Sequence, residues 1–309
     1  MPVVIEFNHF NKLAGFSEWL ISSEKGAQRL FHGRGQCFTG YDFFTVDYFE
    51  PVLWLVLYRE PDADFWDQFC AALELEFAGI CSAAIVQSRY DKSPSTYCLW
   101  GNIPKKLYAF EGQNRFKLDL NNKQNIGYFM DMQPTRLWLS GRAAGQRILN
   151  LFSYTCAFSV AAEQAGAESI LNIDTSWPAL SQGRENHSLN PVLRSAKVKF
   201  LGHNILKSWG LLKKLGPFDI VICDPPSRQE GSFNAFKDYR KLVRQFPALL
   251  PGGGDVLVCL NAPYLGQRFL EETMATFCPS ATFVSRLTGR LDFPEADSDA
   301  ALKVLHYRL

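Results

Sequence analysis

The sequence predicts an α/β protein with a doubly wound, mostly parallel sheet in its C-terminal part and a smaller α+β domain before it. Two observations predict this fold. From Arg147 onward, short runs rich in Val, Ile and Leu alternate with longer amphipathic segments, which is the pattern of βαβ units around a parallel sheet. The chain has 309 residues, 47% of them hydrophobic, so it is long enough for two domains with separate cores.

Residues 1–124 are expected to form the smaller domain, a substrate-recognition region that ends in a β-hairpin. Large apolar side chains recur every fourth residue from Phe65 to Phe77, which predicts an amphipathic helix that begins near Asp62 or Asp64. Apolar runs bounded by turn residues predict strands at 51–58, 83–90 and 106–120, the last as the hairpin.

Residues 125–309 are expected to form the larger, Rossmann-like domain. Seven strands are predicted, at 148–152, 169–174, 197–201, 218–223, 255–260, 281–287 and 302–308. The helices between them are predicted at 157–165, 177–189, 206–215, 234–250 and 266–277. Ligands of such seven-stranded sheets bind at the carboxyl ends of the strands, near the switch point of the strand order.

Composition excludes several classes of protein. The longest apolar run, at 51–58, is much shorter than the roughly 20 residues of a membrane span. The first residues have neither the basic region nor the cleavage site of a secretory signal. The eight cysteines include no C-x-x-C pair and no neighbouring histidine cluster, which argues against a disulfide framework or a metal site. These features predict a cytoplasmic protein with reduced thiols and no bound metal.

Charge is unevenly distributed although the net charge is only +1. Residues 41–80 are strongly acidic, residues 105–147 are basic, and residues 194–214 contain lysines and an arginine but no acid. This asymmetry favours an anionic partner on one side of the molecule, although ordinary solvated faces give the same pattern.

Polar residues follow the predicted strands where a ligand would bind. No G-x-G-x-x-G or G-x-x-x-x-G-K-[ST] motif is present, which argues against a dinucleotide or a nucleoside triphosphate. Asp174, 22 residues after Phe152, is placed to accept hydrogen bonds from a ribose diol or to cap the next helix. Asn204 is placed to read an adenine edge. Asp224, stiffened by two following prolines, suits the floor of an active site or a plain exit from the strand.

The motifs around these residues resemble a known family. They are Gln124-Asn-Ile-Gly-Tyr-Phe-Met-Asp131, Leu149-Asn-Leu-Phe-Ser-Tyr-Thr155, Ile173-Asp-Thr-Ser176, Asn186 with Asn190, and Phe218-Asp-Ile-Val-Ile-Cys-Asp-Pro-Pro226. In this order and spacing the chain closely resembles, over roughly residues 100–309, the class I S-adenosylmethionine-dependent methyltransferases that modify 23S ribosomal RNA at cytosine C5 or guanine N7. The resemblance implies that S-adenosyl-L-methionine is the cofactor and RNA the substrate.

The resemblance also implies roles for single residues. It places the methionine end of the cofactor at Phe152, Ser153, Tyr154 and Thr155, its ribose at Asp174, and its adenine at Thr175 and Asn204. The methyl-transfer centre is expected at Asp224 and Pro225, with Asp224 also binding the cofactor. The segment over the cofactor is expected at Gly127, Tyr128 and Asp131.

The chain departs from the family pattern at four places. Cys156-Ala157 stands where two glycines are usual, Asn204 where an acid is usual, and Gln133 where an arginine is usual. The fourth place, Leu260-Asn261-Ala262, is where cytosine-C5 enzymes carry a nucleophilic cysteine. Because an amide cannot form the covalent adduct that C5 chemistry needs, we expect direct transfer to a nitrogen or oxygen, with Asn261 and Asp224 orienting the acceptor.

A basic stripe follows the Asp224 motif. Lys237, Arg240, Lys241 and Arg244 fall on one face of the predicted helix 234–250, and the aromatic residues Phe233, Phe236 and Tyr239 lie beside them. Basic side chains that track phosphates and aromatic rings that stack on bases are typical of single-stranded RNA binding. A solvated helix face is the simpler explanation of the stripe alone.

Four functions share this fold and are ranked by the motifs. An RNA methyltransferase fits best, and a methyltransferase of a small molecule or a protein comes next, because the net charge is near zero. An NAD-dependent oxidoreductase would share Asp174 but lacks the glycine fingerprint. A non-catalytic relative that binds cofactor or RNA would explain the altered motif positions.

Overall fold

The computed structural model describes residues 26–90, 95–120, 125–192, 196–229 and 233–309. The chain forms two compact units, of which the first contains Met1–Met130 with Arg290–Ala296 and the second Asp131–Gly289 with Asp297–Leu309. Gln124, the first residues of the chain and the arginine at position 194 in the basic segment 194–214 lie outside the described ranges. The division into residues 1–124 and 125–309 stays a prediction.

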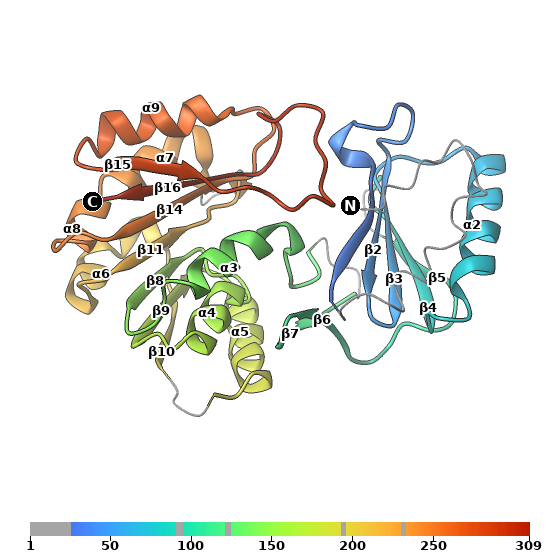
Figure 1. Cartoon of the computed structure of the whole chain (residues 1–309), viewed down its shortest axis with the longest axis horizontal. Helices are drawn as coiled ribbons and strands as arrows, with labels where there is room; N and C mark the ends of the chain where they lie inside the picture. Colours follow the sequence, from blue (N-terminus) through green and yellow to red (C-terminus); the bar gives the residue numbers. More distant parts are fainter. Residues whose placement is uncertain (1–25, 91–94, 121–124, 193–195, 230–232) are drawn as a thin grey trace. The chain divides into compact units, whose positions relative to one another are not determined.

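The described part of the first unit is a five-stranded sheet with helix α2 packed against it (Figure 1). The strands lie in sequence order, β1 (Gln28–His32), β2 (Phe44–Phe49), β3 (Val52–Leu57), β4 (Ala83–Ser88) and β5 (Ser95–Trp100). Only β3 and β4 are parallel, because α2 (Ala63–Phe77) crosses between them. The Asp62 carboxylate accepts a hydrogen bond of 3.0 Å from the Phe65 N–H, so α2 is capped where the sequence predicts its start.

Two further segments belong to this unit. Strands β6 (Leu107–Glu111) and β7 (Asn114–Leu118) form the predicted hairpin, and a single turn of 3-10 helix, η2, spans Gly33–Gly35. Residues 290–296 return to the unit, where the Ala296 N–H donates to the Gly35 carbonyl at 2.8 Å and Asp292 accepts from the Arg29 N–H at 3.0 Å. This return joins residues 263 positions apart, and no local pattern predicts it.

The second unit is a seven-stranded sheet in the order β10-β9-β8-β11-β14-β16-β15. Its strands are β8 (Arg147–Leu151), β9 (Ser169–Asp174), β10 (Lys197–Gly202), β11 (Ile220–Cys223), β14 (Asp255–Leu260), β15 (Thr282–Arg286) and β16 (Lys303–Arg308). Only β16 runs against the others, pairing antiparallel with β14 and β15. The prediction of a mostly parallel, doubly wound sheet is confirmed.

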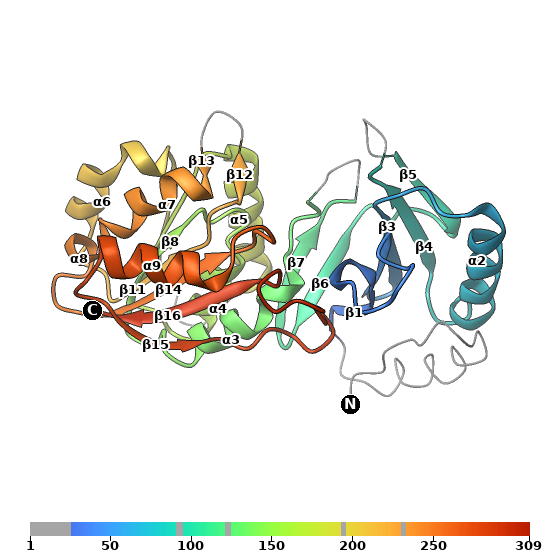
Figure 2. The same cartoon turned by 90° about the horizontal axis from the view of Figure 1, so that it is seen from above.

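Helices cover both faces of this sheet (Figures 1 and 2). The helices on one face are α3 (Gln133–Ser140), α4 (Ala157–Gln164) and α5 (Trp177–Leu189), and those on the other are α6 (Trp209–Leu215), α7 (Ala235–Val243), α8 (Phe246–Leu249) and α9 (Gln267–Phe277). Short 3-10 turns, η3 (Met130–Met132) and η4 (Ile205–Lys207), precede α3 and α6. None of the described helices is both long enough and apolar enough to cross a membrane.

Two predicted helices are divided in the structure. The segment 206–215 splits into η4 and α6, and 234–250 splits into α7 and α8. Pro247 lies in the first turn of α8, where its missing N–H does no harm, whereas within a continuous helix it would remove one hydrogen bond and clash with the preceding turn. A small ladder of β12 (Arg228–Gln229) and β13 (Phe233–Asn234) before α7 was not predicted.

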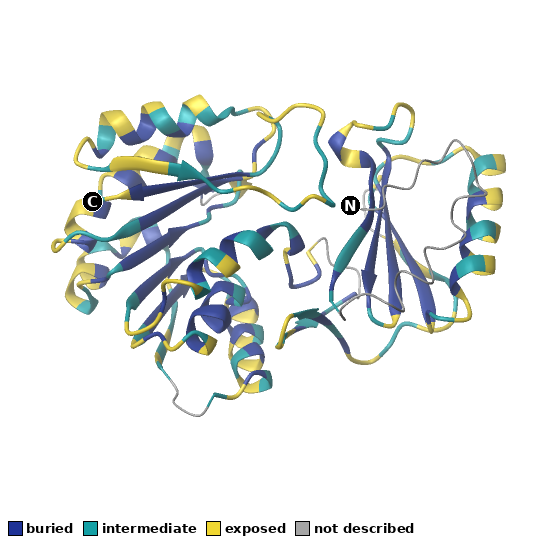
Figure 3. Ribbon diagram, in the orientation of Figure 1, coloured by how far each residue is buried: buried dark blue, intermediate teal, exposed yellow. Residues whose placement is uncertain are grey.

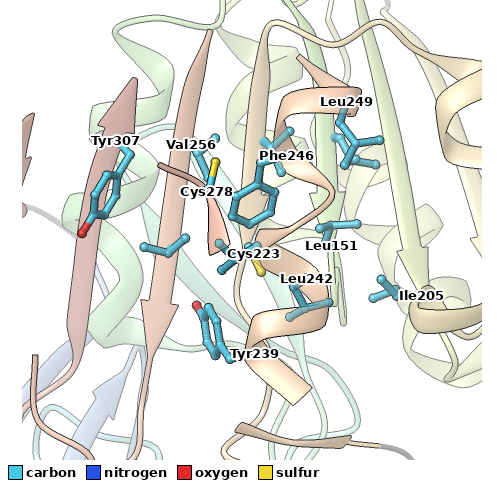
Figure 4. Packing of buried hydrophobic residues seen from close by; sticks show 14 of the residues in the cluster. Leu151, Ile205, Cys223, Tyr239, Leu242, Phe246, Leu249, Val256, Cys278 and Tyr307 are labelled. Atoms are coloured by element: carbon cyan, nitrogen blue, oxygen red, sulfur yellow. The ribbon is translucent and has the colours of Figure 1, made fainter. Parts of the chain in front are cut away.

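Alternate residues of the central strands fill the two layers of the core, and the strands are buried along most of their length (Figure 3). On the side of α6–α9, Cys223 lies among Leu151, Leu242 and Phe246 (Figure 4). Cys259 faces the opposite layer, with α3 and α4. The sheet is therefore a rigid, dry platform for the loops at its carboxyl edge.

Candidate functional site

The loop between β8 and α4 has an unusual backbone. Phe152, Tyr154 and Cys156 have φ values of 58°, 47° and 62°, a left-handed region that non-glycine residues seldom adopt, at a cost of about 1–3 kcal/mol each. Such residues persist only where their surroundings fix them, and they cluster at ligand sites. Here the Ser153 N–H donates to the Ile173 carbonyl at 3.1 Å, which ties the loop to β9.

Asp174 connects this loop to the next one. One of its carboxylate oxygens accepts from the Tyr154 N–H at 2.9 Å and the other from the Ser176 N–H at 2.8 Å. The helix cap is Ser176, whose hydroxyl accepts from the Ala179 N–H at 3.3 Å, so the interpretation of Asp174 as the cap is wrong. A carboxylate has about four acceptor positions, and the two backbone bonds orient Asp174 while leaving acceptor capacity for a ligand.

Cys156 fits where the family pattern has glycine because α5 carries a glycine opposite it. A Cβ atom on Gly183 would lie 2.5 Å from the Cys156 sulfur, so the thiol occupies the space above Gly183. The side-chain amide of buried Asn186 donates to the Thr155 carbonyl at 2.9 Å. The backbone carbonyl of Asn186 accepts from the side-chain amide of Asn190 at 2.7 Å. The altered loop is therefore packed and held from α5.

A small pocket that is open to solvent lies beside this loop, lined by Phe152, Thr175, Asn204, Ile205, Leu206, Gln229 and Phe233. It brings together Phe152, Thr175 and Asn204, which the sequence analysis took from three different strand ends. The Phe152 and Phe233 rings meet edge to face at 5.2 Å. Sequence reasoning missed Ile205 and Leu206 as lining residues; their signal is an apolar pair directly after the polar Asn204.

Asp224 lies at the same carboxyl edge, directly after β11. Desolvation, and then the nearby Asp131 carboxylate, raise its pKa to about 7, against the opposing effect of the Arg136 guanidinium. Arg136 is itself buried. Because Cys223 pairs with Val258, β11 and β14 end side by side, and exposed Asn261 follows β14 at this edge. A carboxyl group with a pKa near 7 can both hold and release a proton at neutral pH.

The two cysteines nearest this edge are poor nucleophiles. Cys223 and Cys259 are both fully buried, on opposite faces of the sheet. Burial raises the pKa of both thiols well above the usual range, so neither is ionised at neutral pH. All eight cysteines are free thiols.

The predicted covering segment belongs to the first unit except for Asp131. Gly127 has a φ of 103°, which favours glycine. The Tyr128 hydroxyl donates to Glu111 at 2.5 Å and its ring stacks on Phe116. Asp131 begins the second unit, where it acts on the pKa of Asp224.

The basic stripe is on one exposed face of α7 and its end, as expected: Lys237, Arg240, Lys241 and Arg244 are all exposed. The expectation that three aromatic residues accompany it is wrong. Tyr239 and Phe233 are buried, and only Phe236 is exposed, at 68%. Tyr239 belongs to an apolar stripe with Leu242 and Val243 that packs on the sheet. Its helical spacing with these residues therefore places the Tyr239 ring in the core and not on the RNA-binding surface.

The site suits S-adenosylmethionine on structural grounds. The Ser153 hydroxyl oxygen is buried without a hydrogen-bond partner among the described residues, at the place expected for the methionine end. Next to Ser153 lies Asp174, whose carboxylate is oriented by the Tyr154 N–H and would meet the ribose. The pocket at Thr175 and Asn204 would then take the adenine. Among the described residues, no cluster of three or more His, Cys, Asp or Glu side chains is arranged to bind a metal.

Comparisons with known proteins point to the same cofactor. The family described as S-adenosylmethionine-dependent methyltransferase matches residues 28–308. A Bacillus subtilis protein provisionally named ribosomal RNA large subunit methyltransferase YwbD is 30% identical over 282 residues, 86% of this chain and 70% of that protein. Ribosomal RNA large subunit methyltransferase I of Aeromonas salmonicida is 30% identical over 56% of this chain, which covers only 45% of that relative's length.

Solved structures show the same architecture. A Streptococcus mutans protein described as a SAM-dependent methyltransferase superposes with a TM-score of 0.85 and 25% identity, over 100% of this chain and 83% of that one. The structure of the methyltransferase SMU.776 in complex with SAH gives the same TM-score and identity over 98% of this chain and 81% of that one.

Proposed function

The chain belongs to the S-adenosylmethionine-dependent methyltransferase family, and from this premise we propose that it methylates a base of ribosomal RNA by direct transfer to a nitrogen or an oxygen. Direct transfer is supported by two buried cysteines, Cys223 and Cys259, which lie beside the half-buried carboxyl group of Asp224, whose pKa is about 7. The names of the relatives support the substrate class. A cytoplasmic location follows from that substrate.

We assign cofactor binding to the loops at the carboxyl ends of β8, β9 and β10. The bound cofactor supplies a methyl group on a positively charged sulfur, which is already a good leaving group. Phe152, Ser153, Tyr154 and Thr155 would hold the methionine end, and Asp174 the ribose. Thr175 and Asn204 would bind the adenine, and the Asn204 amide oxygen can accept from its amino group. Asp131, which belongs to the same unit as these loops, would cover the cofactor, whereas the roles of Gly127 and Tyr128 stay an expectation from the resemblance.

The acceptor would be held by Asp224, Pro225 and Asn261. Asp224 in its ionised form accepts a hydrogen bond from an N–H or O–H acceptor and takes its proton as the new bond to carbon forms. Pro225 fixes the backbone after Asp224. Asn261, exposed at the adjacent strand end, offers both a donor and an acceptor to a base edge. Covalent attack on cytosine C6 needs a thiolate that neither buried cysteine supplies.

RNA would extend over the exposed face of α7. Its four basic side chains would neutralise phosphates. Lys241 already pairs with Asp238 at 2.7 Å, and the Arg244 guanidinium lies 4.5 Å from the centre of the Phe277 ring. Lys237 and Arg240 are therefore the better probes of RNA binding.

The test uses the full chain with methyl-labelled S-adenosylmethionine and ribosomal RNA from cells that lack this protein. We expect label in RNA, in a nucleoside that carries the methyl group on nitrogen or oxygen after nuclease digestion. Label in 5-methylcytidine would refute direct transfer. Label only in protein or small molecules, from a chain that binds S-adenosylhomocysteine, would replace RNA with the corresponding substrate class.

A further inference from the structure

A fully buried lysine holds the loop that follows β14. Lys303, the first residue of β16, has no exposed surface. Its Nζ donates to the Ala262 carbonyl at 3.1 Å and to the Asp299 carbonyl at 2.5 Å. A lysine is almost never fully buried unless its charge is used, and here its ammonium group lies between two segments of chain.

The contacted loop is a tight turn. The Ala262 carbonyl accepts from the Leu265 N–H at 3.1 Å, which closes the turn Ala262-Pro263-Tyr264-Leu265, with proline at the position where turns prefer it. Lys303 binds the same carbonyl, so the turn is fixed from inside the protein as well as along its own backbone. Ala262 is buried, whereas Asn261 and Tyr264 are exposed, Tyr264 at 65%.

The segment that contains Asp299 also fixes the start of α9. The Asp299 carboxylate accepts from the Gln267 N–H at 3.2 Å, and Gly266 leaves room for it, since a Cβ there would lie 2.7 Å from an Asp299 oxygen. Arg286 adds bonds to the Gln267 side chain at 3.0 Å and to the Ser298 carbonyl at 2.9 Å. The turn is thus held at both ends.

The register places this turn at the reactive edge of the sheet. Lys303 pairs with Leu260, the last residue of β14, and β14 lies beside β11, whose last residue, Cys223, directly precedes Asp224. The turn therefore leaves the sheet one strand away from Asp224. An exposed aromatic ring at such an edge is suited to stack on an unpaired base, as aromatic side chains do in proteins that bind single-stranded nucleic acid.

We propose that the turn Ala262–Leu265 is the platform for the acceptor base, with Tyr264 stacking on the base and Lys303 acting as the positioning residue that holds the turn. This proposal rests on the proposed methylation of RNA. It gives the buried lysine a role in acceptor alignment, because the turn that it contacts follows β14, whereas the cofactor loops follow β8, β9 and β10.

The first experiment compares Lys303→Ala with Lys213→Ala, a control at an exposed lysine of α6. We expect Lys303→Ala to lower kcat/KM for RNA about 100-fold, the loss typical of a misplaced reactant, with S-adenosylhomocysteine affinity within about twofold of wild type. n-Propylammonium replaces the deleted atoms and should restore activity saturably, whereas 1-propanol should not. Rescue by both compounds, or by neither in a folded variant, would contradict positioning by the ammonium group.

The second experiment does not depend on turnover. Hydrogen exchange of the Leu265 and Gln267 amides should accelerate in Lys303→Ala and slow again with n-propylammonium. Unchanged exchange would show that Lys303 does not hold the turn. If the wild-type protein transfers no methyl group to RNA but hydrogen exchange changes as expected, RNA is not the substrate. The conclusion that Lys303 holds the turn is then kept.

The role of the ring is tested by Tyr264→Ala and Tyr264→Phe. We expect the alanine variant to raise KM for RNA by at least about tenfold, and the phenylalanine variant to act like wild type because it keeps the stacking face. Equal loss in both variants would assign the role to the hydroxyl, and no loss in either would remove Tyr264 from the acceptor site.

Discussion

Replacing Asp174 by alanine should weaken cofactor binding without unfolding the protein. In the structure both carboxylate oxygens are oriented by backbone N–H groups, at 2.9 Å from Tyr154 and 2.8 Å from Ser176. A hydrogen bond from a ribose hydroxyl to a charged group contributes about 1.5–3 kcal/mol. The affinity for S-adenosylhomocysteine should therefore fall by about 10- to 150-fold.

Isothermal titration calorimetry measures this loss, and two comparisons identify its cause. Ser176→Ala removes the helix cap beside Asp174 and should cost about 1 kcal/mol of stability with little change in affinity. A 2′,3′-dideoxy analogue of S-adenosylhomocysteine should bind wild type weakly and lose little more in Asp174→Ala. A folded Asp174→Ala protein that binds S-adenosylhomocysteine as wild type does would refute the ribose assignment.

Three other predictions follow from the site. Because the pKa of Asp224 is raised to about 7 from 3.8, its ionisation costs stability as pH rises between these values; Asp224→Asn should raise the thermal stability above pH 7 but not at pH 4. RNA containing 5-fluorocytosine should give no denaturation-resistant complex with the enzyme and cofactor, because Cys223 and Cys259 are buried. Replacing Lys237 and Arg240 by alanine should flatten the salt dependence of RNA affinity by roughly one to two log–log units.

Each of these predictions has a contradicting result. Equal effects of Asp224→Asn at pH 4 and pH 8 would show that the Asp224 carboxyl group titrates normally. A trapped adduct that disappears in Cys223→Ala or Cys259→Ala would restore cytosine-C5 chemistry. An unchanged salt slope would make the α7 stripe a solvated surface.

The order of strands and helices could be predicted from the sequence because it depends on local patterns. Ser169–Asp174, Trp177–Leu189 and Asp255–Leu260 begin and end where their residue patterns indicate. The polar residues after the strands were also found locally, since parallel strands bring their carboxyl ends to one edge. The pocket at Thr175 and Asn204 lies where this rule expects it.

The prediction for Tyr239 was wrong because two patterns overlap in the same helix. Tyr239 is aromatic, polar at its tip and next to basic residues, but its spacing with Leu242 and Val243 places it in the core. Its hydroxyl then donates to the Cys259 carbonyl at 2.7 Å. The spacing was visible in the sequence, but which face of the helix packs on the sheet depends on the burial of the whole apolar stripe.

The sequence by itself determined the sheet, its ligand edge and the chemical types of the residues along that edge. Only the tertiary structure decided which distant residues meet there. Gly183 leaves room for the Cys156 thiol, Asp131 acts on the pKa of Asp224, and Lys303 reaches the Ala262 carbonyl 41 residues away. The local periodicity of the sequence does not predict such contacts, because they depend on strand register and on desolvation. Both are set only when the complete core has packed.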